Sequence, residues 1–275
     1  MKIRKASGKV QEFDPRKLLD SLMRSGAARD QAENILEKVM PDVLPLTTTK
    51  QIYRLAHKYL KQINHATVLR YSLKKGILRL GPSGYPFEKY FGELLKNYGY
   101  DVQTNLLLEG KCVSHEVDVF AVNDREIVLV ECKYRNRVNS APDVKVAMYV
   151  HARFQDLRTA LAPVHPGKTI EGWLVTNTRF TTDAIQFADC AGFQVKSWRH
   201  PDKLSLEKMI EENKLYPITV LSSLNTSQIK RLLENKVILM KDLARMEADT
   251  IKNILSISDR KALNIRKEAE DLCFC

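Results

Sequence analysis

Cysteine is scarce in this 275-residue sequence, and its five copies show no metal-binding spacing. Only Cys273 and Cys275 lie close together, and the single residue between them is one fewer than a C-x-x-C zinc knuckle has. The basic N-terminal stretch contains no apolar segment of the kind found in secretory signals. We therefore predict a cytoplasmic protein with reduced thiols.

Long apolar runs are also missing, since no stretch approaches the roughly 18 uncharged residues that a membrane span needs. This excludes a membrane-spanning protein. The G-x-x-x-x-G-K-[ST] phosphate-binding motif is absent too, which argues against ATP-driven translocation. By contrast, 44% hydrophobic and 8% aromatic residues suffice for packed cores, so the chain as a whole is not expected to be disordered.

The formal net charge of +11 is distributed unevenly along the chain. Residues 1–80 contain 17 basic and 7 acidic residues, whereas residues 81–200 contain 14 of each. Residues 201–275 contain 13 basic and 12 acidic residues. A basic protein is often a nucleic-acid partner, but an excess confined to one segment indicates modules with different partners.

Turn residues divide the sequence into three units. The run Gly81–Pro86 would end a helix, and a second break extends from His200-Pro201 towards Tyr216-Pro217, with a short helix between them. We therefore predict an α/β multidomain protein. Its expected domains are residues 1–81, with a β-hairpin on a helical bundle, residues 84–200, with an α/β sheet, and residues 217–275, which are all α-helical.

The N-terminal unit begins with a predicted hairpin, in which two short strands flank Ser7-Gly8. Asp14 can cap a helix that starts at Pro15, and further helices are predicted at 29–39, 47–63 and 65–79. A glycine turn between basic strands could hold an anion, but an ordinary solvated basic hairpin has the same pattern. The residues alone leave both interpretations open.

The runs Ile3–Gly8, Phe13-Asp14, Lys17-Leu18 and Val68–Tyr71 resemble the ATP-cone, a regulatory module best known from ribonucleotide reductases. That resemblance implies a four-helix bundle whose hairpin lid covers ATP or dATP. It assigns phosphate contacts to basic side chains of the lid and the first helix, and the lid turn to a glycine. The nucleotide-binding residues implied here are Lys5, Gly8, Lys9 and Lys17.

The central unit contains the residues with the clearest chemistry. A helix is predicted at 86–98 and strands at 100–107, 116–122 and 127–134, with a turn at Asn123–Glu126. If Val122 pairs with Ile127, Asp118 falls directly opposite Glu131. Lys133 lies two residues beyond Glu131 and therefore shares its face.

Two carboxylates opposed among apolar residues repel each other and are costly to bury. A bridging Mg²⁺ or Mn²⁺ would remove both costs, because hard divalent cations prefer oxygen ligands. Lys133 beside the metal could then orient or deprotonate a water molecule, or neutralise charge on a phosphate. The alternative is a surface ladder in which Lys133 pairs with Glu131 or Glu116.

This unit resembles the PD-(D/E)xK nucleases, in particular Mrr-type restriction endonucleases and archaeal Holliday-junction resolvases. The matching runs are Gly84–Glu88, Glu116–Asp118, Glu131–Lys133, Gly172–Asn177, read as the strand that closes the sheet, and a helix at Thr182–Cys190. The resemblance implies that Asp118 and Glu131 are metal ligands and that Lys133 is the catalytic lysine. Glu88 would be an additional acid on the metal side.

Several neighbouring residues have weaker claims. His115 is predicted to be a solvated loop histidine, and Glu116 shares the face of Asp118. Tyr134, Arg135 and Arg137 follow the strand that ends at the site, and we expect this basic segment to be exposed, where it could contact the DNA backbone. His151 and Gln155 on the next helix are candidates for the rim of the site.

The C-terminal unit is predicted to contain helices at 226–234, 240–245, 248–254 and 259–272. The run Ile254–Ser258, followed by Lys261-Ala262, resembles a hairpin of helix-hairpin-helix DNA-binding domains, with serine in place of the glycine. Binding of DNA and a role as a structural or protein-binding cap remain equally open for this unit.

These features predict a Mg²⁺-dependent deoxyribonuclease, regulated by ATP or dATP, that acts in restriction or repair. DNA and an adenine nucleotide are the expected partners, and the resemblance to nucleases that cut both strands implies a homo-oligomer. Two alternatives remain: a structure-selective nuclease of the Holliday-junction type, and a catalytically inactive, nucleotide-responsive DNA-binding regulator.

Overall fold

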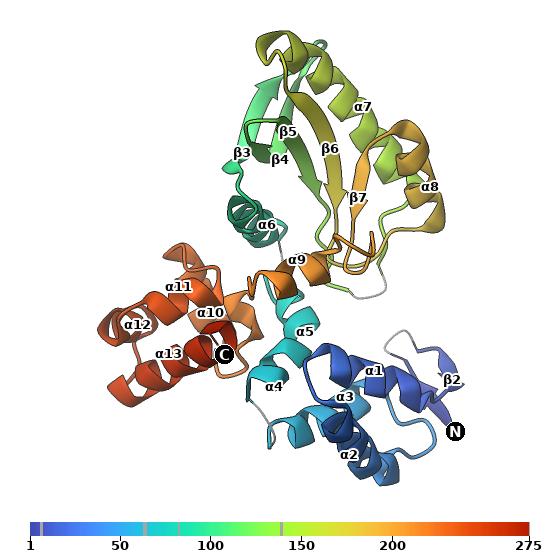
Figure 1. The fold of residues 1–275 in the computed structure, drawn as a ribbon, viewed down its shortest axis with the longest axis vertical. Helices are drawn as coiled ribbons and strands as arrows, with labels where there is room; N and C mark the ends of the chain where they lie inside the picture. The colour runs from blue at the N-terminus through green and yellow to red at the C-terminus, as the bar shows by residue number, and fades with distance from the viewer. Residues whose placement is uncertain (6–7, 63–64, 82, 138–139, 275) are drawn as a thin grey trace.

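The computed structural model describes residues 1–5, 8–62, 65–81, 83–137 and 140–274. Its helices and strands form three groups around a central connection (Figure 1). The sheet and its helices lie at the top of the view, the N-terminal head lies below them, and the last helices form a third group beside the head. Two short helices, α5 and α9, lie where the three groups meet.

The N-terminal head combines a two-stranded hairpin with helices, as predicted. Its elements are β1 (Lys2–Arg4), β2 (Val10–Glu12), α1 (Pro15–Arg24), α2 (Arg29–Val39), a short 3-10 turn (Met40–Asp42), α3 (Thr49–Leu60) and α4 (His65–Tyr71). Asp14 caps α1 by accepting a hydrogen bond from the Arg16 amide. Gly8 has a φ of 83°, which fits the tight turn of the hairpin, while Ser7 lies outside the described residues.

One helix predicted at 65–79 is divided in the structure. Helix α4 ends at Tyr71 and α5 (Leu73–Ile77) follows, with Ser72 between them. The Ser72 hydroxyl lies 3.1 Å from the Tyr53 hydroxyl on α3. The Ser72 amide also donates to the Leu69 carbonyl at 3.0 Å, so the chain makes a tighter turn at this point.

The central sheet has five strands in the order β3-β4-β5-β6-β7. They are β3 (Asp101–Glu109), β4 (Ser114–Val122), β5 (Glu126–Cys132), β6 (Thr169–Val175) and β7 (Gln194–Lys196). The first three strands are antiparallel, and β5, β6 and β7 are parallel. The prediction that Gly172–Asn177 closes the sheet was wrong, because the chain returns through α8 and adds β7 outside β6. That edge strand has only three residues, too few to show an alternating pattern in the sequence.

Helices cover both faces of the sheet. On one face, α6 (Tyr85–Asn97) packs its buried aromatic residues against strand residues such as Val119, Ala121 and Val130. On the other face, α7 (Val144–Leu161) and α8 (Thr182–Ala191) pack against Phe120 and Ile127. A 3-10 turn at Ala162–Val164 follows α7. The sheet is therefore buried on both sides, and polar side chains can gather only near the strand ends.

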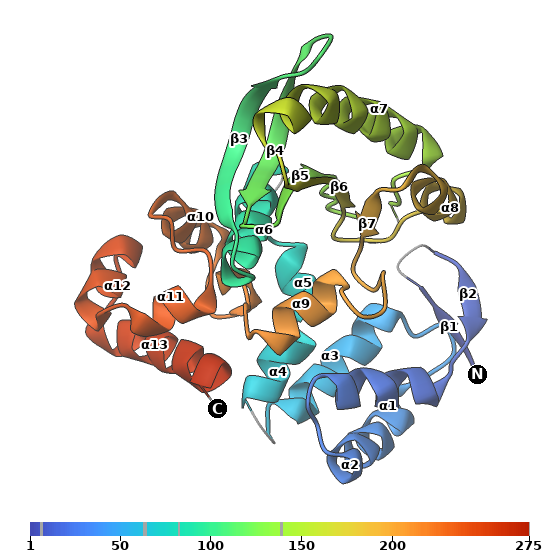
Figure 2. The ribbon, with the colours of Figure 1, turned by 45° about the horizontal axis from the view of Figure 1, so that its top comes forward.

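The remaining elements are α9, which lies at the junction, and those of the C-terminal group. They are α9 (Leu206–Glu212), a 3-10 turn (Ile218–Val220), α10 (Thr226–Glu234), α11 (Met240–Arg245), α12 (Ala248–Leu255) and α13 (Asp259–Phe274). One continuous core joins them to α5, α6 and one face of the sheet, whereas the head has its own core. Figure 2 shows α9 lying across α5, between the sheet and the head. No helix in the described residues is both long and apolar enough to cross a membrane.

Candidate active site at the end of the central sheet

The predicted register of β4 and β5 is confirmed. Val122 pairs with Ile127, and the ladder continues to Val119 and Val130. It stops one pair before Asp118 and Glu131, because the two strands separate there. In place of a backbone bond, the Asp118 carboxylate accepts a hydrogen bond of 2.7 Å from the amide of Cys132. The separation leaves room for side chains at the very position where the two acids lie.

A third acid, Glu88, approaches from α6 and is held by a residue of β3. Asn105 interrupts the β3–β4 ladder opposite Asp118, and its φ of 56° is uncommon for a residue other than glycine. Its side-chain amide donates a hydrogen bond of 3.2 Å to Glu88. The structure thus places Glu88 near the Glu131 carboxylate, and its role as an additional acid on the metal side stays a prediction. Asn105 was missed, since a single asparagine in a strand gives no distinctive signal.

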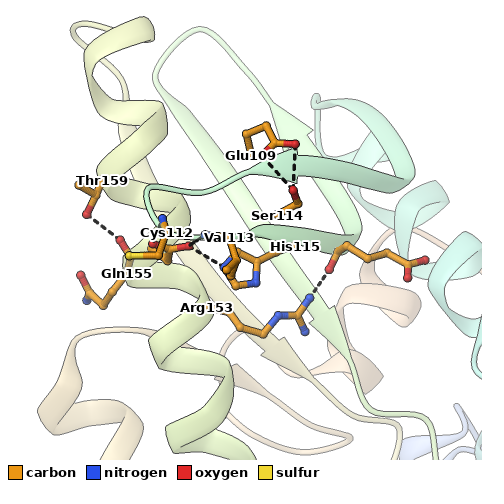
Figure 3. A network of polar contacts seen from close by, with 10 residues as sticks. Glu109, Cys112, Val113, Ser114, His115, Arg153, Gln155 and Thr159 are labelled. Carbon is orange, nitrogen blue, oxygen red and sulfur yellow. Dashed lines mark hydrogen bonds and ion pairs between the residues drawn. The ribbon is translucent and has the colours of Figure 1, made fainter.

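Glu131 is the most buried acid of the group, with 6% of its surface exposed. Lys133 donates to one carboxylate oxygen at 2.5 Å, and Arg153 of α7 donates to the other at 2.7 Å. The Arg153 guanidinium also donates to the main-chain oxygen of Glu116, and Figure 3 shows it reaching from α7 towards β4 beside His115. The pairing of Lys133 with Glu131 is the contact expected from the alternative interpretation of these strands, and the catalytic role of Lys133 stays a prediction. Arg153 was missed, because it lies far from Glu131 along the sequence, on α7.

Two acids of the site have pKa values above the ordinary range for their type. Burial, and after it the nearby Glu131 carboxylate, raise the pKa of Asp118 to about 7, although the Cys132 hydrogen bond acts to lower it. Burial likewise raises the pKa of Glu88, partly offset by the bond from Asn105. These acids therefore lie where a negative charge lacks compensation.

The carboxylates fit a divalent cation as a partial ligand set. Within the described part of the chain, no three histidine, cysteine or acidic side chains lie close enough to hold a metal by themselves. Asp118 and Glu131 could supply two hard oxygen ligands, and solvent and phosphate oxygens would complete the shell. Mg²⁺ is commonly bound in this way.

Other predicted residues lie elsewhere or have different partners. His115 is not a loop residue but belongs to β4, where its ring bonds to Asp156 at 2.8 Å. Tyr134 does not form part of an exposed basic segment, because it is buried and its hydroxyl donates to the Leu78 carbonyl. Of the predicted basic segment, Arg137 is exposed and Arg135 is half-buried.

The two rim candidates on α7 differ in their surroundings. His151 packs between Phe187 and Phe193, with ring centroids 5.8 and 5.3 Å away. Gln155 is exposed and lies 3.4 Å from the His151 ring nitrogen. His151 therefore belongs to the packing between α7 and α8, and Arg153 is the residue of this helix that reaches the acids.

The head contains a cavity of about 440 Å³ beneath its hairpin. Lys5 and Lys17 line it, together with Phe13, Tyr53 and Tyr71. Of the other predicted residues, Gly8 and Lys9 belong to the hairpin turn, where the Lys5 amide donates to the Lys9 carbonyl. The cavity thus combines apolar rings with two ammonium groups.

The C-terminal hairpin turns at a serine. Ser256, between α12 and α13, has a φ of 54° and occupies the left-handed conformation that a glycine would favour. Arg231 of α10 donates to both the Leu255 carbonyl and the Ser256 hydroxyl. These bonds stabilise the turn without a glycine.

Two family models match the chain. The model described as "Restriction endonuclease", of the Mrr catalytic type, covers residues 81–202, and the model described as "AF1548-like, C-terminal" covers residues 216–273. Neither match reaches residues 1–80, so no family assignment supports the resemblance of the head to the ATP-cone.

An uncharacterized protein of Archaeoglobus fulgidus is 31% identical over 177 residues, which are 64% of this chain and 96% of the relative. A crystal structure titled "Crystal Structure of Protein of Unknown Function AF1548" is similar with a TM-score of 0.58 and 30% identity. It covers 70% of this chain and 98% of the solved one. The extent of these matches, together with the domain order, shows that this chain belongs to the AF1548-like family and contains a restriction endonuclease domain of the Mrr type.

Proposed function

We propose that the protein is a metal-dependent DNA endonuclease whose active site comprises Asp118, Glu131, Lys133 and Glu88. The observation that carries the proposal is the convergence of the first three side chains where β4 and β5 separate. The Mrr-type domain favours a nuclease over other uses of a carboxylate pair, and a Mg²⁺ or Mn²⁺ ion would be held by Asp118 and Glu131.

Each side chain has a distinct part in this proposal. The bound cation would supply Lewis-acid activation of water and stabilise charge on the phosphate. Asp118 is held by the Cys132 amide, which fixes its carboxylate at the opening between the strands. Lys133 places an ammonium group beside Glu131, where it can orient a water molecule or offset phosphate charge. Asn105 of β3 holds the Glu88 carboxylate of α6 by a hydrogen bond.

A cleavage assay with Mg²⁺ tests this assignment. We expect cleavage by the wild type, and a loss of about a hundredfold or more in rate for Asp118→Asn and for Lys133→Met. Lys111→Met, which removes an exposed lysine from the β3–β4 turn, is the matched control and should cut normally. Equal rates for all four proteins would contradict the assignment of these residues.

The same assay separates the substrate classes when plasmid, methylated and branched DNA are compared. Preference for methylated or foreign DNA supports restriction, and preference for a four-way junction supports a structure-selective nuclease. If no DNA form is cut but DNA is bound, the protein is instead an inactive DNA-binding regulator.

A nucleotide-binding role for the head is a second proposal, and it rests on the cavity beneath the hairpin. Lys5 and Lys17 could contact the phosphates of ATP or dATP, while Phe13 and the tyrosines offer surfaces for a base. Gly8 and Lys9 would shape the lid. Calorimetry with ATP and dATP should detect binding that Lys17→Met weakens and that Lys50→Met, an exposed change on α3, leaves intact. Absence of heat with both nucleotides would refute this role.

We also propose that the head regulates cleavage, and the position of two tyrosines supports this link. Tyr53 and Tyr71 stack with their ring centroids 4.9 Å apart. Both rings line the head cavity and also a cavity of about 170 Å³ that Arg199 and Glu211 line from the other side. A nucleotide that moves these rings would act on the segment after β7. Cleavage rates measured with and without ATP test this link, and identical rates would exclude it.

The division into domains at 1–81, 84–200 and 217–275, DNA binding by the α12–α13 hairpin and a homo-oligomeric assembly remain proposals. Light scattering tests the assembly, and DNA affinity of a Lys261→Glu variant tests the hairpin. A monomer, or unchanged DNA affinity, would contradict the respective proposal.

A further inference from the structure

Arg153 is the one contact of the site that the proposed chemistry does not use. It extends from the middle of α7 and donates to Glu131 and to the main-chain oxygen of Glu116. Only 15% of its side chain is exposed, compared with 8% for the Glu131 side chain. A long cationic side chain that is mostly buried and bonded to two acceptors is expected to have a specific role.

The two cations bonded to Glu131 use both of its oxygens. Lys133 holds one oxygen and Arg153 holds the other. A buried carboxylate with one partner removed is strongly destabilising, so this pair of cations accounts for how Glu131 remains buried without a metal. The same arrangement gives each oxygen of Glu131 a cationic donor, so a metal ion would share either oxygen with a positive charge.

The two donors differ in how they are held. Lys133 follows Glu131 on the same segment and has three rotatable N–H donors, so it can move aside and remain near the acid. The Arg153 guanidinium is planar and is anchored to the Glu116 carbonyl. It therefore faces Glu131 from α7, across the opening where the strands separate.

We propose that Arg153 holds the place of the divalent cation on Glu131 in the metal-free protein, and that a metal ion binds there against its positive charge. This inference rests on the proposed metal site. A fixed positive charge within a few ångströms of the site repels a divalent ion, so Arg153 sets the metal affinity as well as the stability of the metal-free site. It is a positioning residue, because it acts through Glu131.

For Arg153→Gln the proposal predicts lower thermal stability but tighter metal binding. Without metal, the thermal midpoint should fall by several degrees, because Glu131 loses a partner. The dissociation constant for Mn²⁺, measured by calorimetry on the full chain without DNA, should fall about tenfold, because the competing charge is gone. Arg153→Lys keeps the charge and should bind Mn²⁺ within about twofold of the wild type.

Arg158→Gln is the matched control, since it removes the same charge from the last turn of the same helix. Its Mn²⁺ affinity should equal that of the wild type. Arg153→Met serves as a second neutral variant in case the glutamine variant folds poorly.

Weaker or unchanged Mn²⁺ binding in the folded neutral variants overturns the proposal. If Arg153 only supported the fold, replacing it would not strengthen metal binding. If the wild type itself binds no Mn²⁺, and Asp118→Asn gives the same silent titration, the metal site fails and this inference fails with it. Metal binding by the wild type that is unaffected by Arg153 would overturn the inference alone.

Discussion

At the scale of single residues, the site is a set of charges that the fold compensates only in part. Glu131 has two cationic partners, whereas Asp118 has one backbone hydrogen bond and two acidic neighbours. Burial and repulsion raise the pKa of Asp118 to about 7. The metal-free protein therefore tolerates this side chain at a cost in stability, a common feature of residues that serve function.

Replacing Asp118 with asparagine should stabilise the metal-free protein at pH 8. Asparagine keeps an oxygen for the Cys132 amide but removes the charge, so the free energy of unfolding should rise by about 2–4 kcal/mol, given about 1.4 kcal/mol for each pKa unit. In the folded wild type the raised pKa means that stability falls as the pH rises from about 4 to about 7. The gain should therefore be small at pH 4.

Urea denaturation at both pH values measures this gain, and Asp124→Asn in the exposed β4–β5 turn is the control. A loss of stability for Asp118→Asn at pH 8 would show that the carboxylate is compensated after all.

At the scale of elements, Asp156 of α7 joins that helix to the β3–β4 hairpin by hydrogen bonds. Asp156 accepts hydrogen bonds from the Cys112 and Val113 amides, at 2.8 and 3.3 Å, and from His115. Burial alone would raise its pKa, but the bonds from His115 and Cys112 outweigh it and lower the pKa to about 2. The network around the hairpin turn, drawn in Figure 3, fixes α7 on the sheet. Arg153 lies one helical turn earlier, so this acid also helps to fix its position.

Asp156→Asn should destabilise the protein at pH 7. Because the pKa of Asp156 is lowered in the folded state, its contribution is complete above about pH 4 and is lost as the pH falls towards 2. The difference between the variant and the wild type should therefore shrink between pH 5 and pH 2.

Thermal midpoints across this pH range measure the effect, with Asp101→Asn at the exposed start of β3 as the control. A difference that is independent of pH would mean that the carboxylate charge is not what joins the elements.

At the scale of the whole molecule, α5 and the segment after it connect the groups. Arg79 donates hydrogen bonds to the carbonyl oxygens of Thr219, Leu221 and Leu224, at 2.7–3.0 Å. The Thr219 hydroxyl in turn donates to the Gly76 carbonyl at 2.7 Å. Residues about 140 positions apart are thus joined through the side chains of Arg79 and Thr219, and the sheet and the C-terminal helices share one core.

Arg79→Met should lower the free energy of unfolding by about 2–3 kcal/mol. Methionine fills much of the same volume but leaves carbonyl groups unsatisfied, and hydrogen bonds to charged groups contribute about 1.5–3 kcal/mol. Urea denaturation measures the change, and Lys38→Met on α2 of the head is the control. An unchanged midpoint would show that solvent satisfies these carbonyls equally well.

Much of the fold follows from local patterns in the sequence. The predicted ranges of α2, α10 and α11 agree with the structure, and those of most other elements differ only at their ends. Capping residues such as Asp14 and the turn at Asn123 act over a few positions, so they are readable in one dimension. The break at Ser72 and the edge strand β7 were missed, and β7 is decided by its pairing with β6 rather than by a local pattern.

The candidate site divides in the same way. The sequence by itself determined that Asp118, Glu131 and Lys133 lie together, because the turn fixes the register and the period of a strand fixes the face. Only the tertiary structure decided where the ladder opens, which residue holds Glu88 and that Arg153 reaches Glu131. Those contacts join elements that are distant along the chain, and packing, rather than local pattern, brings them together.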